Sequence, residues 1–112
     1  MIISFALTAS EFLNGGKTET RRDWKDRTLR VWQCAWDHGH HVHQASDKAI
    51  YRGGKIIGRL LLTARPERQS LFFMTPTDLK AEGGMCRTVV EFCHLVKQSP
   101  VKPMTVIKFQ KL

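Results

Sequence analysis

Apolar positions along the chain recur with two spacings, one typical of strands and the other of helices. Short apolar runs bounded by turn residues predict strands at 1–7, 55–64 and 105–109. A helix is predicted over 26–36, because Leu29, Trp32 and Trp36 recur at i, i+3 and i+7. A strand over 29–32 is the open alternative there, since Leu, Val and Trp also suit extended backbone. Trp32 is expected in the core.

Capping residues mark three further helices. A short helix is predicted after Thr8, which fits a capping box with Glu11. Thr75 and Pro76 predict a second start, as N-cap and first helical residue. Glycine pairs end these two helices, at Gly15-Gly16 and at Gly83-Gly84. A third helix is predicted over 87–96, with Val89, Val90, Cys93 and Val96 on one face.

The middle of the chain carries weaker signals. The stretch 40–45 leads into a polar loop, and 51–54 is a turn. Gly58, inside an apolar run, predicts a bulge or a close backbone approach. Strands at both ends with helices between them, and no βαβ repetition, predict an α+β fold with a strongly bent sheet or small barrel. The length suits a single domain, 1–112.

Charge and cysteine content narrow the partners and the compartment. Lys and Arg number 18 against 10 Asp and Glu, a formal net charge of +8. So basic a small domain attracts polyanions, most often nucleic acid, although a charge that only aids solubility is the alternative. No apolar run predicts a membrane span or a signal peptide, and no protein partner is indicated. Three cysteines without a CxxC pair predict reduced thiols and a cytoplasmic protein.

The densest chemistry follows the first glycine pair. Lys17, two threonines, Glu19 and two arginines stand within six residues. In an extended segment Thr18, Thr20 and Arg22 share one face. Lysine and arginine bind phosphate as a point charge and as a planar fork. This segment therefore predicts a binding site for a phosphate or a polar ring.

Other candidate residues surround this segment in the sequence. Trp24 is a candidate for stacking on a base, with a cap over the following helix as the alternative. Lys48, Tyr51 and Arg52 are candidates for the rim of a cleft, with solvated loop charge as the alternative. The histidines at 38–43 lack regularly spaced cysteine or carboxylate partners, so no metal site is predicted, and no cofactor.

Taken in order, these pieces resemble an ASCH domain, a relative of the PUA fold. The resemblance spans nearly the whole chain and is nearest to short stand-alone bacterial and phage forms. It rests on the helix ending at Gly15-Gly16, on 17–22, 55–58 and 74–84, on the helix with Phe92, and on 106–109. It implies a small β-barrel flanked by helices, a cleft beside the barrel, and the RNA binding proposed for the family.

The resemblance also implies a candidate reaction. Some small bacterial members deacetylate acetylated cytidine nucleosides with a lysine, a threonine and a glutamate. Gly15, Lys17 and Arg22 match the family motif Gly-x-Lys-x-x-Glu-x-Arg. The Glu position of the motif holds Thr20, as in the hydrolase-type members, and Glu82 matches the hydrolase glutamate. The chain between 22 and 51 is longer and richer in Trp and His than in that subgroup.

Each role makes a chemical demand. A threonine hydroxyl such as that of Thr20 attacks a carbonyl only when a base takes its proton. Lys17 is such a base only if burial and the charges of Arg21 and Arg22 lower its pKa from ~10.4, against the opposite pull of Glu82. The alternative is an ordinary ion pair beside a strand threonine. We therefore predict binding of RNA or a modified nucleoside through a basic cleft, with amide hydrolysis as the alternative.

Overall fold

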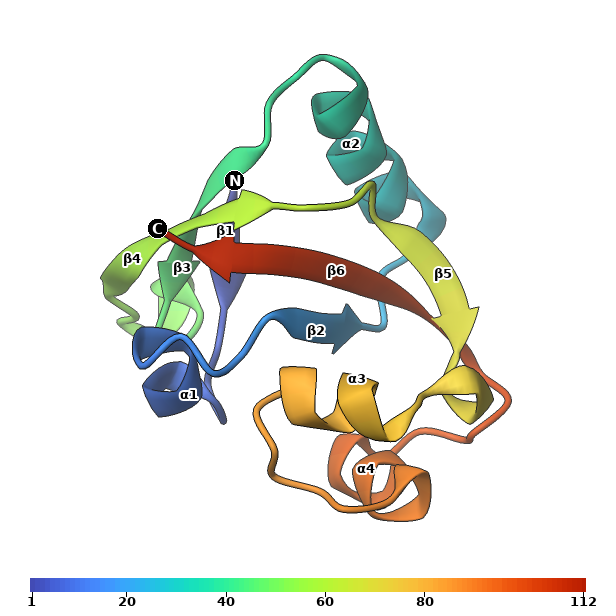
Figure 1. Ribbon diagram of the computed structural model, residues 1–112. Helices are drawn as coiled ribbons and strands as arrows, with labels where there is room; N and C mark the ends of the chain where they lie inside the picture. Colours follow the sequence, from blue (N-terminus) through green and yellow to red (C-terminus); the bar gives the residue numbers. More distant parts are fainter.

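A six-stranded sheet curls through the computed structural model, which describes residues 1–112 (Figure 1). Five strands form a path in the order β1 (Ile2–Ser4), β3 (Val42–Ser46), β4 (Ile56–Leu62), β6 (Pro103–Lys111) and β2 (Glu19–Arg22), and β5 (Glu67–Ser70) also pairs with β6. Only β1 and β3 run parallel. The end strands β1 and β2 do not pair with each other, so the curled sheet does not close and is a half-barrel.

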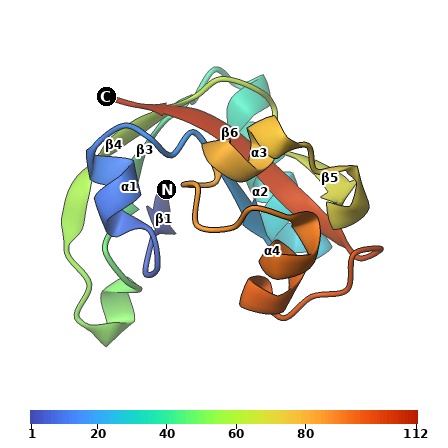
Figure 2. The ribbon, with the colours of Figure 1, turned by 60° about the horizontal axis from the view of Figure 1, so that its bottom comes forward.

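Four α-helices and two short 3₁₀ helices surround this sheet. They are α1 (Ala9–Leu13), α2 (Asp26–Asp37), α3 (Pro76–Ala81), α4 (Val89–Val96), η1 (Ile50–Arg52) and η2 (Leu71–Phe73). Figures 1 and 2 show α3 and α4 together, and Figure 1 places α2 at the opposite end of the sheet. The predicted α+β class is confirmed, and the half-barrel is consistent with a small barrel flanked by helices. No helix is long and apolar enough to cross a membrane.

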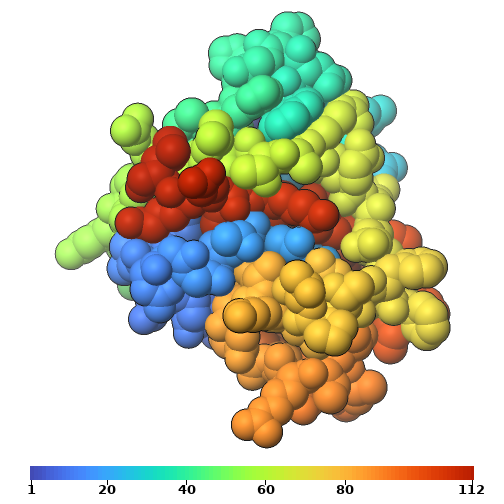
Figure 3. Space-filling model, in the orientation of Figure 1, coloured from blue at the N-terminus to red at the C-terminus, as the bar shows by residue number.

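Strand β6 organises the sheet. One of its edges pairs first with β5 and then with β4, and the other edge pairs with β2. The chain between β4 and β5 contains Pro66, which has no backbone N–H to donate to a ladder. Figure 3 shows β6 in red, running between β2 in blue and β4 in yellow-green. This pairing fixes β2, which carries most of the candidate residues.

Two hydrophobic cores flank β2. The larger core, inside the curl of the sheet, packs Phe5, Phe12 and Phe109 with ring centroids 4.9–6.0 Å apart. The smaller core lies among η2, α3, α4 and the start of β6, and consists of Leu71, Met74, Leu79, Phe92, Cys93 and Met104. Strand β2 therefore borders the region where the two cores meet.

Several local predictions are confirmed. Residues 26–37 form a helix rather than the alternative strand, and Trp32 is buried in the larger core. Thr75 caps α3, with its side chain accepting from the backbone N–H of Asp78. Gly58 lies beside the bulge between β3 and β4, and a Cβ there would stand 3.3 Å from the ring of Phe12. The three cysteines are unpaired thiols.

Other predictions are wrong for identifiable reasons. The stretch expected to lead into a polar loop forms a strand at 42–46, whose alternation is hidden because one of its buried side chains, His43, is polar. Strand β5 is entirely polar and exposed or half-exposed, so it has no apolar signal. Thr8 precedes α1 but makes no capping hydrogen bond, and the first strand ends at Ser4. Val90 on α4 is 62% exposed, and Phe92 is buried instead.

Candidate functional site

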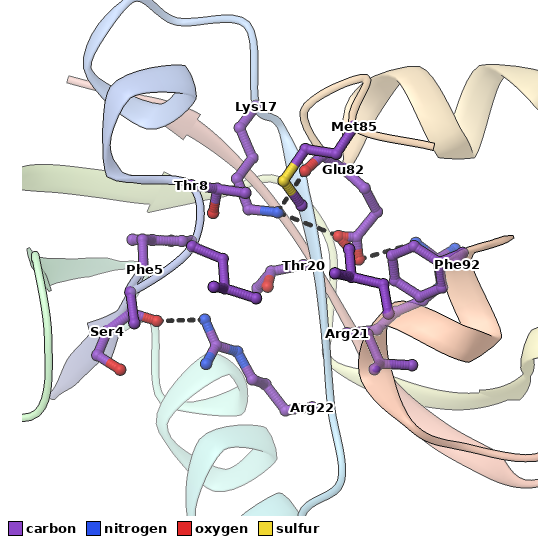
Figure 4. A pocket seen from close by; sticks show the side chains of 14 residues that line it. Ser4, Phe5, Thr8, Lys17, Thr20, Arg21, Arg22, Glu82, Met85 and Phe92 are labelled. Atoms are coloured by element: carbon purple, nitrogen blue, oxygen red, sulfur yellow. Dashed lines mark hydrogen bonds and ion pairs between the residues drawn. The ribbon is translucent and has the colours of Figure 1, made fainter. Parts of the chain in front are cut away.

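A cavity of about 240 Å³ opens where the two cores meet (Figure 4). Phe5 lines it from the larger core and Phe92 from the smaller one. Its polar side chains come from the segment after α1, from β2 and from the end of α3: Lys17, Thr20, Arg21, Arg22 and Glu82. Two distant parts of the sequence, 17–22 and Glu82, thus supply polar groups to one hollow.

Lys17 and Glu82 form a buried pair across this cavity. The Lys17 Nζ donates to the backbone oxygen of Glu82 at 2.6 Å and to its Oε2 at 3.1 Å. Each residue is only 4% exposed. Lys17 leaves the turn after α1, where Gly15 has a positive φ of 79°, and Glu82 ends α3. The segment after α1 and the end of α3 therefore project into the same hollow.

The electrostatic balance at Lys17 lowers its pKa. Burial lowers the pKa of Lys17, because the ammonium loses its hydration. Glu82 raises that pKa by its charge and its hydrogen bond, and Arg22 and Arg21 lower it. The net direction is downward from 10.5. Desolvation therefore outweighs the carboxylate, as the role of a base requires.

Thr20 lies on the face of β2 that borders the cavity. It is 4% exposed, and its backbone pairs opposite Ile107 of β6. Figure 4 shows its side chain between the ends of Lys17 and Arg22. The hydrogen bonds of Lys17 Nζ go to Glu82 rather than to Thr20. The predicted nucleophile and base share a pocket but are not hydrogen-bonded to each other.

Arg22 spans the gap between the two end strands of the sheet. From β2, its Nη2 donates to the backbone oxygen of Ser4 on β1. Its guanidinium carbon lies 5.6 Å from the ring centroid of Phe5, and its Nε has no partner. Burial lowers its pKa, with an opposing contribution from Glu82. A guanidinium has five N–H donors, so Arg22 keeps donor capacity beside the cavity.

Arg21, the next residue, points into a cluster of carboxylates. Its side chain is 1% exposed. Nη1 lies 3.2 Å from Glu19 Oε2 and 3.5 Å from Glu82 Oε1, and Nη2 lies 3.8 Å from Asp78 Oδ2. Burial raises the pKa of Glu19 even though Arg21 opposes the shift. These contacts hold Glu82 in place, and Arg21 also lines the cavity.

The other predicted residues divide between a second hollow and open surface. Trp24 and Tyr51 line a neighbouring hollow of about 280 Å³, and Arg52 lies 5.5 Å from the Tyr51 ring centroid. Trp24 is half-buried and stacks on Trp32 at 5.1 Å, so the cap over the helix is part of its role. Gly15 and Lys48 are exposed and line neither hollow.

Sequence reasoning missed the walls of the cavity. Phe5, Met85 and Phe92 look like ordinary core residues in the sequence, because an apolar side chain has the same pattern in a core and in a pocket wall. The backbone oxygen of Ser4 has no sequence signature. Asp78 offered a signal as the carboxylate of the α3 capping box, but its approach to Arg21 depends on the tertiary fold.

Comparison with protein-family models, with curated proteins and with solved structures gives no match for this chain. The fold and the site are therefore known from the structure alone: an α+β half-barrel with a small pocket between two cores, lined by apolar walls and by Lys17, Arg21, Arg22 and Glu82. The cavity lies just below the usual size range of drug-sized sites, so it suits one small ring system. It offers a carboxylate acceptor, a guanidinium donor and a hydroxyl between two aromatic walls.

Proposed function

We propose that the protein binds RNA, or a modified nucleoside, through this cavity. The observation that carries the proposal is Arg22, a largely buried guanidinium with unused donors beside a pocket. Buried polar groups are nearly always hydrogen-bonded, so an unfilled donor there favours a ligand with acceptor oxygens. The net charge of +8 adds long-range attraction for a phosphate backbone.

The lining also suits the ring of a nucleoside. A cytosine base presents a carbonyl oxygen and an exocyclic amine at its edge, and two apolar faces. Arg22 is a donor for that oxygen, and Glu82 is an acceptor for the amine. Phe5 and Phe92 offer apolar contact from opposite cores. The half-barrel flanked by helices also agrees with the fold that the ASCH resemblance implies, and we propose that PUA-like assignment with the function.

Binding is tested by titrating the protein with N-acetylcytidine and with single-stranded RNA at several salt concentrations. Arg22→Gln is expected to weaken nucleoside affinity about tenfold or more, since a charge-assisted hydrogen bond contributes about 1.5–3 kcal/mol. Arg30→Gln is the matched control, because Arg30 is exposed on α2 and lines neither hollow. A flat salt response to RNA, or equal affinities for the two variants, contradicts the proposal.

A second function, hydrolysis of an acetylated amine, is favoured by a specific observation. Lys17, Thr20 and Glu82 line the same cavity, and the pKa of Lys17 is lowered. In this reaction neutral Lys17 takes the Thr20 proton as Oγ1 bonds to the acetamide carbon. The C–N bond then breaks, and Lys17 passes the proton to the leaving amine. Water hydrolyses the acetyl ester, which releases acetate and restores the hydroxyl.

This reaction requires Lys17 Nζ to move from Glu82 toward Thr20. In the structure Nζ is hydrogen-bonded to Glu82, so the contact with Thr20 forms when the substrate is bound. The test follows acetate release from N-acetylcytidine. Thr20→Val keeps the shape and removes the hydroxyl, so turnover should disappear while nucleoside binding persists. Wild-type turnover should rise with pH as Lys17 loses its proton. Binding without acetate release leaves recognition as the function.

A further inference from the structure

The second hollow adjoins the candidate site and shares two of its residues. It lies between β1, η1 and the segment after β2, and encloses about 280 Å³. Ser4 and Arg22 line both hollows. Because the Arg22 side chain crosses to Ser4 between the two end strands, it stands at the boundary of the two spaces. A ligand that reaches Arg22 from the first hollow is therefore next to the second.

The lining of the second hollow is apolar, aromatic and exposed. Ile2, Ile50 and Tyr51 are 44%, 48% and 84% exposed, and all three line it. Trp24 adds an indole that rests on Trp32. Large apolar side chains that gather at a hollow of a small protein mark a binding surface rather than chance exposure. Aromatic rings of this kind stack on nucleic-acid bases of any sequence.

The second hollow also has polar groups, which disfavour a purely hydrocarbon ligand. Two buried atoms of its lining residues, Arg22 Nε and Ser46 Oγ, have no hydrogen-bond partner. The Arg52 guanidinium lies 5.5 Å from the Tyr51 ring centroid, so positive charge stands at the rim as well as between the hollows. Cations on either side of an aromatic surface complement an anionic linker that joins two rings.

We propose that the second hollow is a stacking subsite for the nucleotide adjacent to the one in the first cavity. The protein then recognises a strand of at least two nucleotides, with Arg22 near the phosphodiester between them, in preference to a free nucleoside. This inference rests on the proposed function, since it needs a nucleoside in the first cavity. It assigns Trp24 and Tyr51 to the neighbouring base.

The experiment compares three probes by calorimetry: cytidine, cytidine 3′-monophosphate and cytidylyl-(3′→5′)-cytidine. The dinucleotide is expected to bind about tenfold tighter than the monophosphate, a gain within the range that stacking one base on an aromatic side chain provides. Tyr51→Ala should remove most of this gain and leave cytidine affinity unchanged. Tyr51 is 84% exposed, so its loss removes little packing, and Phe72→Ala, an aromatic that is 70% exposed, is the matched control.

The outcomes separate the two proposals. Equal affinities for the monophosphate and the dinucleotide, with cytidine bound, overturn the subsite and keep the first cavity. A dinucleotide gain that survives both Tyr51→Ala and Trp24→Leu also overturns it, because the extra affinity then arises elsewhere. If none of the three probes binds, the proposed function fails, and this inference fails with it.

Discussion

Arg21 and Arg22 are neighbours in the sequence, but their guanidinium groups have different partners in the structure. Arg21 is 1% exposed and lies within 4 Å of three carboxylates, those of Glu19, Asp78 and Glu82. Arg22 has one hydrogen bond, to a backbone oxygen, and a buried Nε with no partner. Successive residues of a strand point to opposite faces, so β2 separates the two side chains. Both arginines line the cavity, but the donors of Arg21 face carboxylates, whereas Arg22 keeps unused donors.

This difference shows how a charged segment divides into structural and ligand-facing parts. An arginine whose donors are already taken by carboxylates has little capacity for a ligand and much influence on the fold. An arginine with unused donors beside a cavity can bind a ligand and contributes less to the stability of the fold. The chain also links the two, because Glu82 contacts Arg21 on one side and Lys17 on the other. Arg21 therefore acts on the candidate site through Glu82.

The largest expected effect is on folding. Arg21→Met should lower the free energy of unfolding by about 3–5 kcal/mol, because it leaves buried carboxylates without their cation. Urea denaturation followed by tryptophan fluorescence measures this change. Arg22→Met is the matched variant and should lose about 1 kcal/mol, for one hydrogen bond to a backbone oxygen. Equal losses for the two variants would show that the contrast between them is wrong.

The next effect is on affinity rather than stability. Arg22→Lys keeps the charge but loses the planar fork, so one ammonium cannot replace both the bond to Ser4 and a bidentate contact to a ligand. Nucleoside affinity should fall by about tenfold while the unfolding midpoint changes little. Arg21→Lys should do the opposite, with lower stability and nearly normal affinity in the fraction that stays folded. Calorimetry on the folded protein at low temperature separates the two.

The sequence predicted the parts of the site but not this division. Lys17, Thr20, Arg22 and Glu82 were chosen from spacing and resemblance, and all four line one cavity. Arg21 was also predicted as a ligand contact and lines the same cavity, but alternation along β2 does not say that carboxylates face its donors. That depends on α3, which brings Asp78 and Glu82 from about 60 residues away.

The fold shows the same limit. Strands with apolar signals, such as β4 and β6, follow from the sequence, whereas β3 and β5 do not. His43 takes a core position of β3, next to the ring of Trp32 at 4.5 Å, so the alternating pattern is hidden by a polar residue. Strand β5 owes its conformation to pairing with β6, a contact that no local pattern records.

A smaller effect should appear in the pH dependence of stability. The pKa of Lys17 lies below 10.5 in the folded protein, so between the folded value and 10.5 the unfolded chain binds more protons. Stability should therefore rise with pH across that window, by at most about 1.4 kcal/mol per pH unit. Urea midpoints at pH 7, 9 and 10 for wild type and Lys17→Met measure the difference. Parallel curves for the two proteins would contradict a lowered pKa.

The smallest effect tests how far the buried ion-pair cluster around Arg21 extends. Lys108 Nζ lies 3.9 Å from Glu19 Oε1, and its side chain is 53% exposed, against 1% for Arg21 on the same carboxylate. Exposed pairs contribute a few tenths of a kcal/mol and are screened by salt. Lys108→Ala should thus lower the free energy of unfolding by a few tenths of a kcal/mol in dilute buffer and by nothing measurable in 1 M salt. The larger loss of unfolding free energy in Arg21→Met should persist in 1 M salt. If both losses vanish in salt, the Arg21 cluster is hydrated, and Arg21 is as available to a ligand as Arg22.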